Sequence, residues 1–504
     1  MQSVHLHYMK KFYITTPIYY VNSKPHIGHA YTTVIADILA RYYRLKLGED
    51  KTYFLTGTDE HGAKIAQKAE EAGKTPLDFA TEVAEEFKFV WKELNISNND
   101  FIRTTEERHE KIVKELLLKL KDAKTPKGND AIYSGKYEGL YCVGCEAYKN
   151  PEDLVNGKCP EHNKEPELLS ENNWFFRLTD FSEILHNKIE KDEIKILPAE
   201  RKKEILSFIE HGLQDIAISR EKIKWGIKVP FDDKQVIYVW VDALINYISA
   251  LGFPDGEKYK KFWPADLHLL GKDIAKFHCI IWPAMLIALN IETPKELFVH
   301  GYFTIDGQKM SKTLGNVIDP LDLVKEYGVD ATRYLLVSQF PFGEDGDIKV
   351  EEFKVKFNSD LANGLGNLVS RVCGMLEKYC DNVIPKKKYN ANFDFKKLQK
   401  RIDENYSEYK IFENLKEIWE AIRWCDNYVA ENKPWELAKA GKNDEIEQIL
   451  YNLLEIIRNI VILLSPVLPD TCDKILKFLK VDINSDKLIA GEKIDSAEPL
   501  FLRK

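Results

Sequence analysis

The sequence of 504 residues contains little cysteine and no long apolar run. Its eight cysteines are too few for a secreted, disulfide-stapled scaffold of this size. The longest apolar candidate, residues 456–468, is interrupted by Arg458, Asn459 and Pro466, so no segment reaches the roughly 18 to 20 apolar residues that a membrane-spanning helix needs. The first ten residues hold no apolar run of the kind that marks a signal peptide. We therefore predict a cytoplasmic protein in a reducing compartment, with no membrane partner.

An excess of positive charge is also missing. Lysine and arginine number 72 against 80 aspartate and glutamate, which gives a formal net charge of −8. This total gives no support to a nucleic-acid partner, although it leaves room for a local basic surface. Hydrophobic residues make up 44% of the chain, which is enough to fill several cores and excludes a disordered chain. At about 150 residues per domain, the length predicts about three domains.

The N-terminal part alternates strand-like and helix-like segments. Residues 11–16 predict a strand, and apolar residues at helical spacing from Ile27 predict a helix that Gly48 ends. A second strand is expected at 52–56, where Gly57 would stop it, and a second helix at about 63–73. Alternating strands and helices are typical of a parallel sheet covered by helices. The chain therefore opens with half of an α/β domain.

The rest of the chain divides into segments that differ in residue composition and in expected secondary structure. Turn residues, short aromatic strands and a cysteine cluster occupy residues 127–230, which predicts an insertion with its own small fold. The continuous apolar run 236–241 predicts a buried parallel strand, and two further strand ends are expected at 267–271 and 297–301. Residues 351–479 look almost wholly helical. The predicted units are an α/β half (1–126), the insertion (127–230), the second α/β half (231–300), a linker region with a loop (301–350) and a helical part (351–504).

Two histidines stand three apart around a glycine, as His26-Ile27-Gly28-His29, where the first loop meets the first predicted helix. A helix N-terminus carries unpaired N–H groups and the positive end of the helix dipole, so it accommodates phosphate oxygens. Gly28 would let a nucleotide approach the backbone closely. Taken alone, the pair is equally well interpreted as capping or surface histidines.

A second motif, Lys309-Met310-Ser311-Lys312-Thr313, lies in a glycine-rich loop after the last predicted strand. Two lysines on such a loop can grip a triphosphate and neutralise the charge that develops on leaving pyrophosphate. A solvated lysine pair is the commoner explanation of an isolated motif of this kind. Its combination with the histidine motif, one after the first strand and one after the last, favours the functional interpretation.

Three cysteines and a histidine form the pattern Cys142-x2-Cys145-x13-Cys159-x2-His162. Three thiols and one imidazole complete a tetrahedral zinc site and leave no position open for water, so the predicted zinc is structural. The alternative is a reduced, metal-free loop, which would leave a segment rich in glycine and proline with little core.

The sequence resembles the methionyl-tRNA synthetases, a family of class I aminoacyl-tRNA synthetases, from residue 11 to about residue 469. One departure is Thr313, where serine is the commonest residue of the signature, and the hydroxyl is kept. The segments that carry the resemblance are TTPIYYVN (15–22), HIGHAY (26–31), GTDEHG (57–62), YVWVDALINY (238–247), GKDI (271–274), FH (277–278) and KMSKT (309–313).

The resemblance implies the fold and the activity. The fold would be an α/β, split Rossmann-type parallel-sheet catalytic domain with a zinc-knuckle insertion, followed by an α-helical bundle that binds the anticodon. The activity would be ATP-dependent ligation of methionine to tRNA(Met) through methionyl-adenylate, with one structural zinc and with magnesium accompanying ATP. The sequence leaves the oligomeric state open and slightly favours a monomer.

The resemblance also implies the site residues. Catalysis falls to His26, His29, Lys309 and Lys312, and ATP binding to these four with Gly28 and Ser311. The zinc ligands are Cys142, Cys145, Cys159 and His162, and the anticodon readers are Asn367, Arg371 and Trp435. Local tRNA contact is expected at 386–388 and 188–203, two stretches rich in lysine. The methionine pocket consists of Ile18, Tyr20, Asp59, Trp240, Ala243, Leu244, Tyr247, Ile274 and His278.

Two alternatives compete with this assignment. The first is a class I enzyme for leucine, valine or cysteine. The leucine and valine enzymes carry large editing insertions for which this chain has no room, and a cysteine enzyme would place zinc in its amino-acid pocket with different ligand spacing. The second is a non-catalytic RNA-binding protein that kept the fold, which loss of either signature motif would favour. Both motifs are intact.

Overall fold

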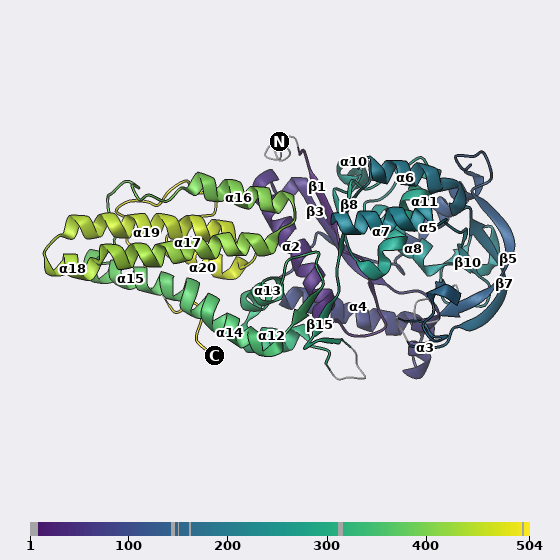
Figure 1. The fold of residues 1–504 in the computed structure, drawn as a ribbon, viewed down its shortest axis with the longest axis horizontal. Helices are drawn as coiled ribbons and strands as arrows, with labels where there is room; N and C mark the ends of the chain where they lie inside the picture. Colours follow the sequence, from purple (N-terminus) through teal and green to yellow (C-terminus); the bar gives the residue numbers. More distant parts are fainter. Residues whose placement is uncertain (1–8, 143–146, 150, 161–162, 311–315, 496–497) are drawn as a thin grey trace.

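The computed structural model describes residues 9–142, 147–149, 151–160, 163–310, 316–495 and 498–504. A helical bundle forms one end of the molecule, and a long β-hairpin lies at the opposite end, beyond a helix-covered sheet (Figure 1). Within the described residues, no helix is long and apolar enough to cross a membrane.

The central sheet is parallel and has seven strands among the described residues. Its order is β4-β3-β1-β13-β14-β8, and β2 continues the line of β1 along the same edge of β3. The bounds are β1 Phe12–Thr15, β2 Tyr19–Tyr20, β3 Thr52–Asp59, β4 Asp100–Arg103, β8 Lys195–Leu197, β13 Leu267–Gly271 and β14 Glu296–His300.

The order of the strands reverses beside β1. The first half of the chain runs outward from β1 to β3 and β4, and the second half runs outward on the other side from β13 to β14. In such sheets ligands bind in the crevice at the carboxyl ends of the strands on either side of the reversal. The predicted split Rossmann-type domain is thereby confirmed, and its crevice opens where β1 and β13 end.

Helices cover both faces of this sheet (Figure 1). Helix α2 begins and ends as predicted, with Ile27 as its first residue and Gly48 after its last. The helices of this half are α2 Ile27–Leu47, α3 Ala63–Glu71, α4 Pro76–Glu93, α5 Glu107–Asp122, α6 Ser182–Glu190, α7 Ala199–Glu210, α8 Val239–Leu244, α9 Asn246–Ser249, α10 Glu257–Phe262 and α11 Trp282–Ala288.

The prediction that Gly57 stops the second strand is wrong. Strand β3 continues through Gly57 to Asp59, and Gly57 pairs with Ile102 of the neighbouring β4. A Cβ atom at Gly57 would lie 2.0 Å from the Ile102 carbonyl oxygen. The glycine is therefore required by the close approach of two strands, and the longer strand carries Asp59 to the carboxyl edge of the sheet.

The run 236–241 is not a parallel strand, contrary to prediction. Its first two residues end β12 (Asp232–Ile237), which pairs antiparallel with β10 (Ser219–Arg220) and β11 (Lys228–Val229). Tyr238 then precedes helix α8. The run is apolar because both pieces are buried, and periodicity alone does not separate a short buried strand from a buried helix.

The stretch 127–230 contains a four-stranded sheet in the order β6-β5-β7-β9. Its main feature is the antiparallel pairing of β5 with β7, which contains the short aromatic strands expected in this stretch, residues 132–133 and 173–176. The same stretch also gives β8 to the edge of the central sheet, beside β14. The bounds are β5 Ile132–Cys142, β6 Ala147–Lys149, β7 Glu167–Phe176 and β9 Ile216–Ala217.

A small sheet and two helices link the α/β part to the bundle. The sheet has the order β16-β15-β17, with β15 Phe303–Ile305, β16 Gln308–Lys309 and β17 Gly346–Ile348. The linking helices are α12 Pro320–Tyr327 and α13 Val329–Val337. The predicted helical part is confirmed, with α14 Val350–Lys356, α15 Asn367–Cys380, α16 Phe395–Ser407, α17 Ile411–Asn432, α18 Pro434–Lys439, α19 Asn443–Leu464 and α20 Pro469–Phe478.

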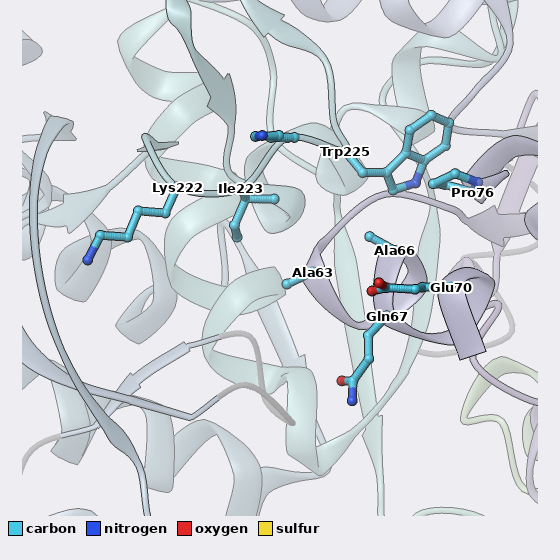
Figure 2. Close-up of a pocket in the computed structure, with 9 residues that line it drawn as sticks. Ala63, Ala66, Gln67, Glu70, Pro76, Lys222, Ile223 and Trp225 are labelled. Carbon is cyan, nitrogen blue, oxygen red and sulfur yellow. The ribbon is translucent and has the colours of Figure 1, made fainter. Parts of the chain in front are cut away.

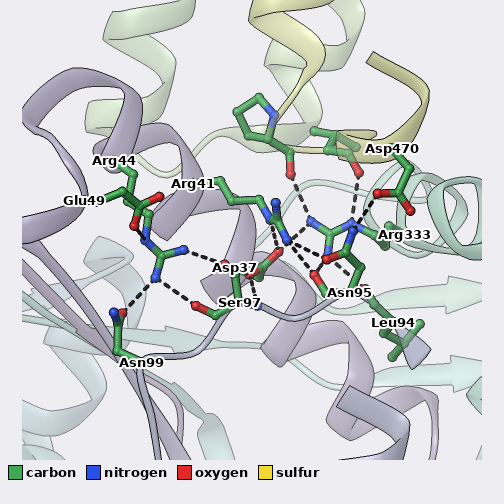
Figure 3. Close-up of polar contacts among 12 residues, drawn as sticks. Asp37, Arg41, Arg44, Glu49, Leu94, Asn95, Ser97, Asn99, Arg333 and Asp470 are labelled. Carbon is green, nitrogen blue, oxygen red and sulfur yellow. Dashed lines mark hydrogen bonds and ion pairs between the residues drawn. The ribbon is translucent and has the colours of Figure 1, made fainter. Parts of the chain in front are cut away.

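A buried ion pair joins the linking helix α13 to the catalytic part (Figure 3). Arg333 of α13 contacts Asp37 of α2 at 2.7 Å, and both side chains are fully buried. Burial alone would raise the pKa of Asp37, but the guanidinium groups of Arg333 and Arg41 hold it below its ordinary value. Arg333 also donates to the carbonyls of Pro466 and Val467, just before α20. Helix α2, whose N-terminus holds His26 and His29, is therefore tied to the bundle through Arg333.

Candidate active site

The two signature histidines lie at the N-terminus of α2, at the carboxyl end of β1. His26 is the N-cap residue, and its Nδ1 accepts a hydrogen bond from the Gly28 amide at 3.1 Å. His29 Nδ1 accepts from the His26 amide at 3.3 Å, and the two rings stack with centroids 3.9 Å apart. The histidines therefore cap the helix and stand stacked together at its positive end.

Burial keeps His29 neutral. Exclusion of water from the buried ring, together with the neighbouring His26, holds the pKa of His29 well below its usual 6.5. A neutral imidazole can donate a hydrogen bond to a phosphate or a ribose from one nitrogen while the other accepts from the backbone. In this arrangement the helix N-terminus supplies the positive field, and the rings supply directed hydrogen bonds.

The lysine-rich loop leaves its strand beside the same helix end. A Cβ atom at Gly28 would lie only 3.1 Å from Cε of Met310, and the Ile27 amide donates to the Ile318 carbonyl at 3.1 Å. Lys309 ends β16, opposite Thr304. The structure thus brings the two motifs together, although Ser311, Lys312 and Thr313 lie outside the described residues, as does the Lys309 side chain.

A hydrogen-bonded chain runs through the proposed methionine pocket. The His278 ring donates from Nδ1 to the Ile274 carbonyl at 3.0 Å, which leaves Nε2 to accept from the Tyr247 hydroxyl at 2.7 Å. Burial lowers the pKa of His278 to about 4, so the ring is neutral near pH 7. Tyr247 and His278 are both buried. These two hydrogen bonds therefore place the His278 proton on Nδ1 and fix the position of the Tyr247 hydroxyl.

The other pocket residues surround this chain. Trp240 stacks on Phe277 with ring centroids 3.9 Å apart, and it meets the His278 ring edge to face at 6.4 Å. Tyr20 is in register with Asp59 at the carboxyl end of β3, and Asp59 is buried. One core cluster contains Leu244 and Tyr247, and four other pocket residues pack on it: Ile18, Tyr20, Trp240 and Ile274. Ala243 is buried beside Leu244 on α8.

We expect His278 to make the stability of the protein depend on pH. Its folded-state pKa of about 4 lies below the ordinary 6.5, so between these values the unfolded chain binds the extra proton. The contribution of His278 to the free energy of unfolding is fully present above pH 6.5 and is lost as the pH falls toward 4. Between pH 8 and pH 5.5 the free energy of unfolding should fall in both proteins. The fall should be about 1.4 kcal/mol smaller in His278→Gln than in the parent. Urea unfolding at both pH values measures this, and identical losses in the two proteins would contradict it.

A buried network behind the pocket was not predicted from the sequence. Asp242 of α8 accepts from His61 and from His109, each at 2.7 Å, and His109 also contacts the Ser249 hydroxyl at 2.7 Å. Burial would lower the pKa of His61, but Asp242 raises it above its usual value. The network ties the 59–62 segment to α8, so it positions Asp59 relative to Trp240.

Glu60 anchors the same segment from the other side. It is fully buried and accepts a two-pronged contact from Arg103 of β4, at 2.7 and 2.9 Å. The Thr58 hydroxyl also donates to it at 2.7 Å. Glu60, His61 and Asp242 all stand in segments quoted for the family resemblance, but their partners Arg103 and His109 stand outside those segments. Sequence spacing gave no signal for these two residues.

The predicted zinc ligands are only partly described. Cys142 ends β5 and is buried, and Cys159 is fully buried within a turn in which the Asn163 amide donates to the Cys159 carbonyl at 2.7 Å. Cys145 and His162 lie outside the described residues, so the geometry of the set of four is not observed.

Two of the three predicted anticodon readers, Arg371 and Trp435, lie side by side in the bundle. Asn367 and Arg371 lie one turn apart on α15, and the Arg371 guanidinium sits 5.9 Å from the ring centre of Trp435 on α18. Arg371 also contacts Asp426 at 3.6 Å. Trp435 is 39% exposed, although large aromatic side chains are usually buried. An arginine and an exposed tryptophan side by side form a surface on which bases can stack.

Comparison with known proteins gives concordant results. A family model described as tRNA synthetases class I (M) matches residues 12–165 and 145–373, and one for the anticodon-binding domain of tRNA ligase matches 393–502. The chain is 44% identical to the methionine–tRNA ligase of Thermotoga maritima over 97% of this chain and 80% of that protein. It is 42% identical to that of Bacillus subtilis over 98% of this chain and 78% of that protein.

Solved structures show the same likeness. Mycobacterium tuberculosis methionyl-tRNA synthetase in complex with methionyl-adenylate superposes with a TM-score of 0.93 at 36% identity, covering 98% of this chain and all of that one. The apo form of the same enzyme gives a TM-score of 0.85 at 33% identity, covering 99% of each chain.

Proposed function

We infer the activity of this chain from the fact that it belongs to the methionyl-tRNA synthetases of class I. It activates methionine with ATP to methionyl-adenylate, releases pyrophosphate, and transfers methionine to the terminal adenosine of tRNA(Met). The product serves initiation and elongation of translation. We place this activity in the cytoplasm.

The observation that carries the proposal is the meeting of the two signature motifs at the crevice of the sheet. Met310 packs over Gly28 at the N-terminus of α2, where a phosphate is stabilised by the helix dipole and by backbone N–H groups. ATP would lie over His26, Gly28 and His29, with Lys309, Ser311 and Lys312 closing on its phosphates. The two motifs are far apart in the sequence, and they meet at the place where sheets of this kind bind ligands.

The amino acid would lie beside the nucleotide. The Asp59 carboxylate is suited to the substrate ammonium, and the rings of Tyr20, Trp240 and Tyr247 are suited to the polarizable thioether. The substrate carboxylate attacks the α-phosphorus, a new P–O bond forms, and the bond to pyrophosphate breaks. The protein's part in this step is positioning and charge stabilisation.

In the second step the 2′-hydroxyl of the terminal adenosine attacks the activated carbonyl, and AMP leaves. Magnesium would accompany ATP and supply positive charge to its phosphates. Because an apolar pocket separates substrates that differ by one methylene by only about 1–3 kcal/mol, homocysteine should also enter the pocket and be discarded as its thiolactone.

Charging of tRNA tests the proposed function. Purified protein, ATP and unfractionated tRNA should form an acid-precipitable ester with labelled methionine but not with labelled leucine, valine or cysteine. Charging with one of those three amino acids in place of methionine would identify a different class I enzyme. Tight tRNA binding without any charging would indicate a non-catalytic RNA-binding protein.

We further propose one structural zinc held by Cys142, Cys145, Cys159 and His162. Support comes from Cys159, which is the only buried residue among the described residues from 149 to 170 whose burial is defined. A thiol sequestered in a segment with so little apolar core fits a metal ligand, because the metal would replace the missing core. Gly157, with a φ of 77°, forms the tight turn before it.

This zinc gives a prediction that does not depend on activity. Protein purified without chelator should contain about one zinc per chain, and Cys145→Ser should lower the metal content and expose the 142–162 segment to protease. Cys472→Ser, which replaces a buried thiol in the bundle, is the matched control and should keep its metal. Active protein that contains no zinc would overturn the assignment.

A further inference from the structure

A surface hollow of about 460 Å³ lies between α3 and the segment that joins β10 to β11 (Figure 2). Small and apolar side chains of both elements form its floor. Its rim carries Gln67 and Glu70 on one side and Lys222 and Lys224 on the other. The full lining consists of Ala63, Ala66, Gln67, Glu70, Pro76, Lys222, Ile223, Lys224 and Trp225.

The hollow is joined to the candidate active site through the backbone. The Trp225 indole N–H donates to the Glu60 carbonyl at 2.7 Å, and the Gly62 amide donates to the Trp225 carbonyl at 3.2 Å. The Trp225 ring also meets the buried His61 ring at 5.3 Å. These bonds hold the wall of the hollow against the residues that directly follow Asp59, so a ligand in the hollow would lie next to the amino-acid pocket.

The two rims carry different chemistry. Lys222 and Lys224 are exposed, and no carboxylate of the described residues forms an ion pair with either. Glu70 and Gln67 are one turn apart on the exposed face of α3, so their side chains reach the hollow together. One rim is thus suited to phosphate groups, and the other can accept hydrogen bonds from amino groups.

We propose that this hollow binds the unpaired cytidine that precedes the terminal adenosine of tRNA. The proposal rests on the proposed function, because only a tRNA charged at its 3′ end brings such a nucleotide to this place. The phosphates would meet Lys222 and Lys224, and the base would lie on the apolar floor beside Trp225. The cytosine amino group would donate to Glu70, a pairing that carboxylates make with this base.

Neutralising the lysine rim tests the phosphate contacts. Lys222→Ala combined with Lys224→Ala should lower kcat/KM for tRNA in aminoacylation by about tenfold at low salt and reduce its salt dependence. Methionine-dependent pyrophosphate exchange should be unchanged, since it uses no tRNA. Lys228→Ala, an exposed lysine of β11 outside the lining, should behave as the parent. A double variant that charges tRNA as fast as the parent would overturn the proposal.

A second experiment tests recognition of the base. Replacing the penultimate cytidine of the tRNA by uridine removes the amino group, and in the parent this should lower kcat/KM by about 5- to 150-fold. In Glu70→Ala the same replacement should cost less than about twofold, because the acceptor is already gone. An equal cost in both proteins would show that Glu70 does not read this base. Absence of methionine-dependent pyrophosphate exchange in the parent protein would instead refute the proposed function.

Discussion

Lys312→Ala is expected to slow methionyl-adenylate formation by about 10²- to 10³-fold, because a preorganised charge on the leaving group is usually worth that much. The loop leaves β16 next to the N-terminus of α2, where Met310 lies over Gly28. Negative charge develops on pyrophosphate only as the bond breaks, so the lysine acts mainly on the transition state. Binding of methionine, which occupies the pocket around Tyr247, should hardly change.

Single-turnover formation of the adenylate measures the rate, and equilibrium binding of methionine measures the affinity. Lys325→Ala provides the control, because Lys325 is an exposed lysine of α12 on the same linking segment and should keep the parental rate. If Lys312→Ala bound methionine weakly and reacted at the parental rate, the role assigned to the loop would be wrong.

Trp435→Ala is expected to reduce the tRNA-dependent step by up to about 150-fold and leave pyrophosphate exchange near the parental value. Removing one stacking platform costs about 1–3 kcal/mol. Trp435 belongs to α18, which lies at the far end of the bundle from α2 (Figure 1). Arg371→Ala should act alike. Because Arg371 sits 5.9 Å from the Trp435 ring centre, the two losses should be less than additive.

Exchange and aminoacylation measured side by side on each variant give this comparison, with a thermal melt to show that the variant is folded. Arg423→Ala is a matched control, since Arg423 is an exposed arginine of α17 whose ion pair is with the exposed Glu420. Equal losses in both reactions, in a folded Trp435→Ala protein, would mean that the bundle is not a separate anticodon reader.

Much of the fold followed from local sequence signals. Helix α2 was predicted because its apolar residues repeat at helical spacing and Gly48 ends it, and β13 and β14 were predicted from short apolar runs ahead of glycines. The sequence placed one motif after the first strand and the other after the last, and the structure brings both to the carboxyl edge of the sheet, where ligands bind in such folds. The family resemblance alone singled out Arg371 and Trp435, and their proximity is a finding of the structure.

The failures occurred where long-range pairing overrode local signals. Gly57 looked like a strand end, but its lack of a side chain serves the approach of Ile102, which is 45 residues away in the chain. The run 236–241 splits between a strand and a helix because both pieces are buried in the same core. His109 gave no signal because only the folded chain brings it to Asp242.

Methionine-dependent exchange of pyrophosphate into ATP, without tRNA, tests the central claim most directly. It requires the nucleotide site at α2, the lysine-rich loop and the amino-acid pocket to work together, and it needs no other macromolecule. We predict exchange that depends on methionine and is absent with leucine, valine or cysteine at equal concentration. Folded protein that exchanges no pyrophosphate with methionine, or that exchanges it equally with leucine, would contradict the account.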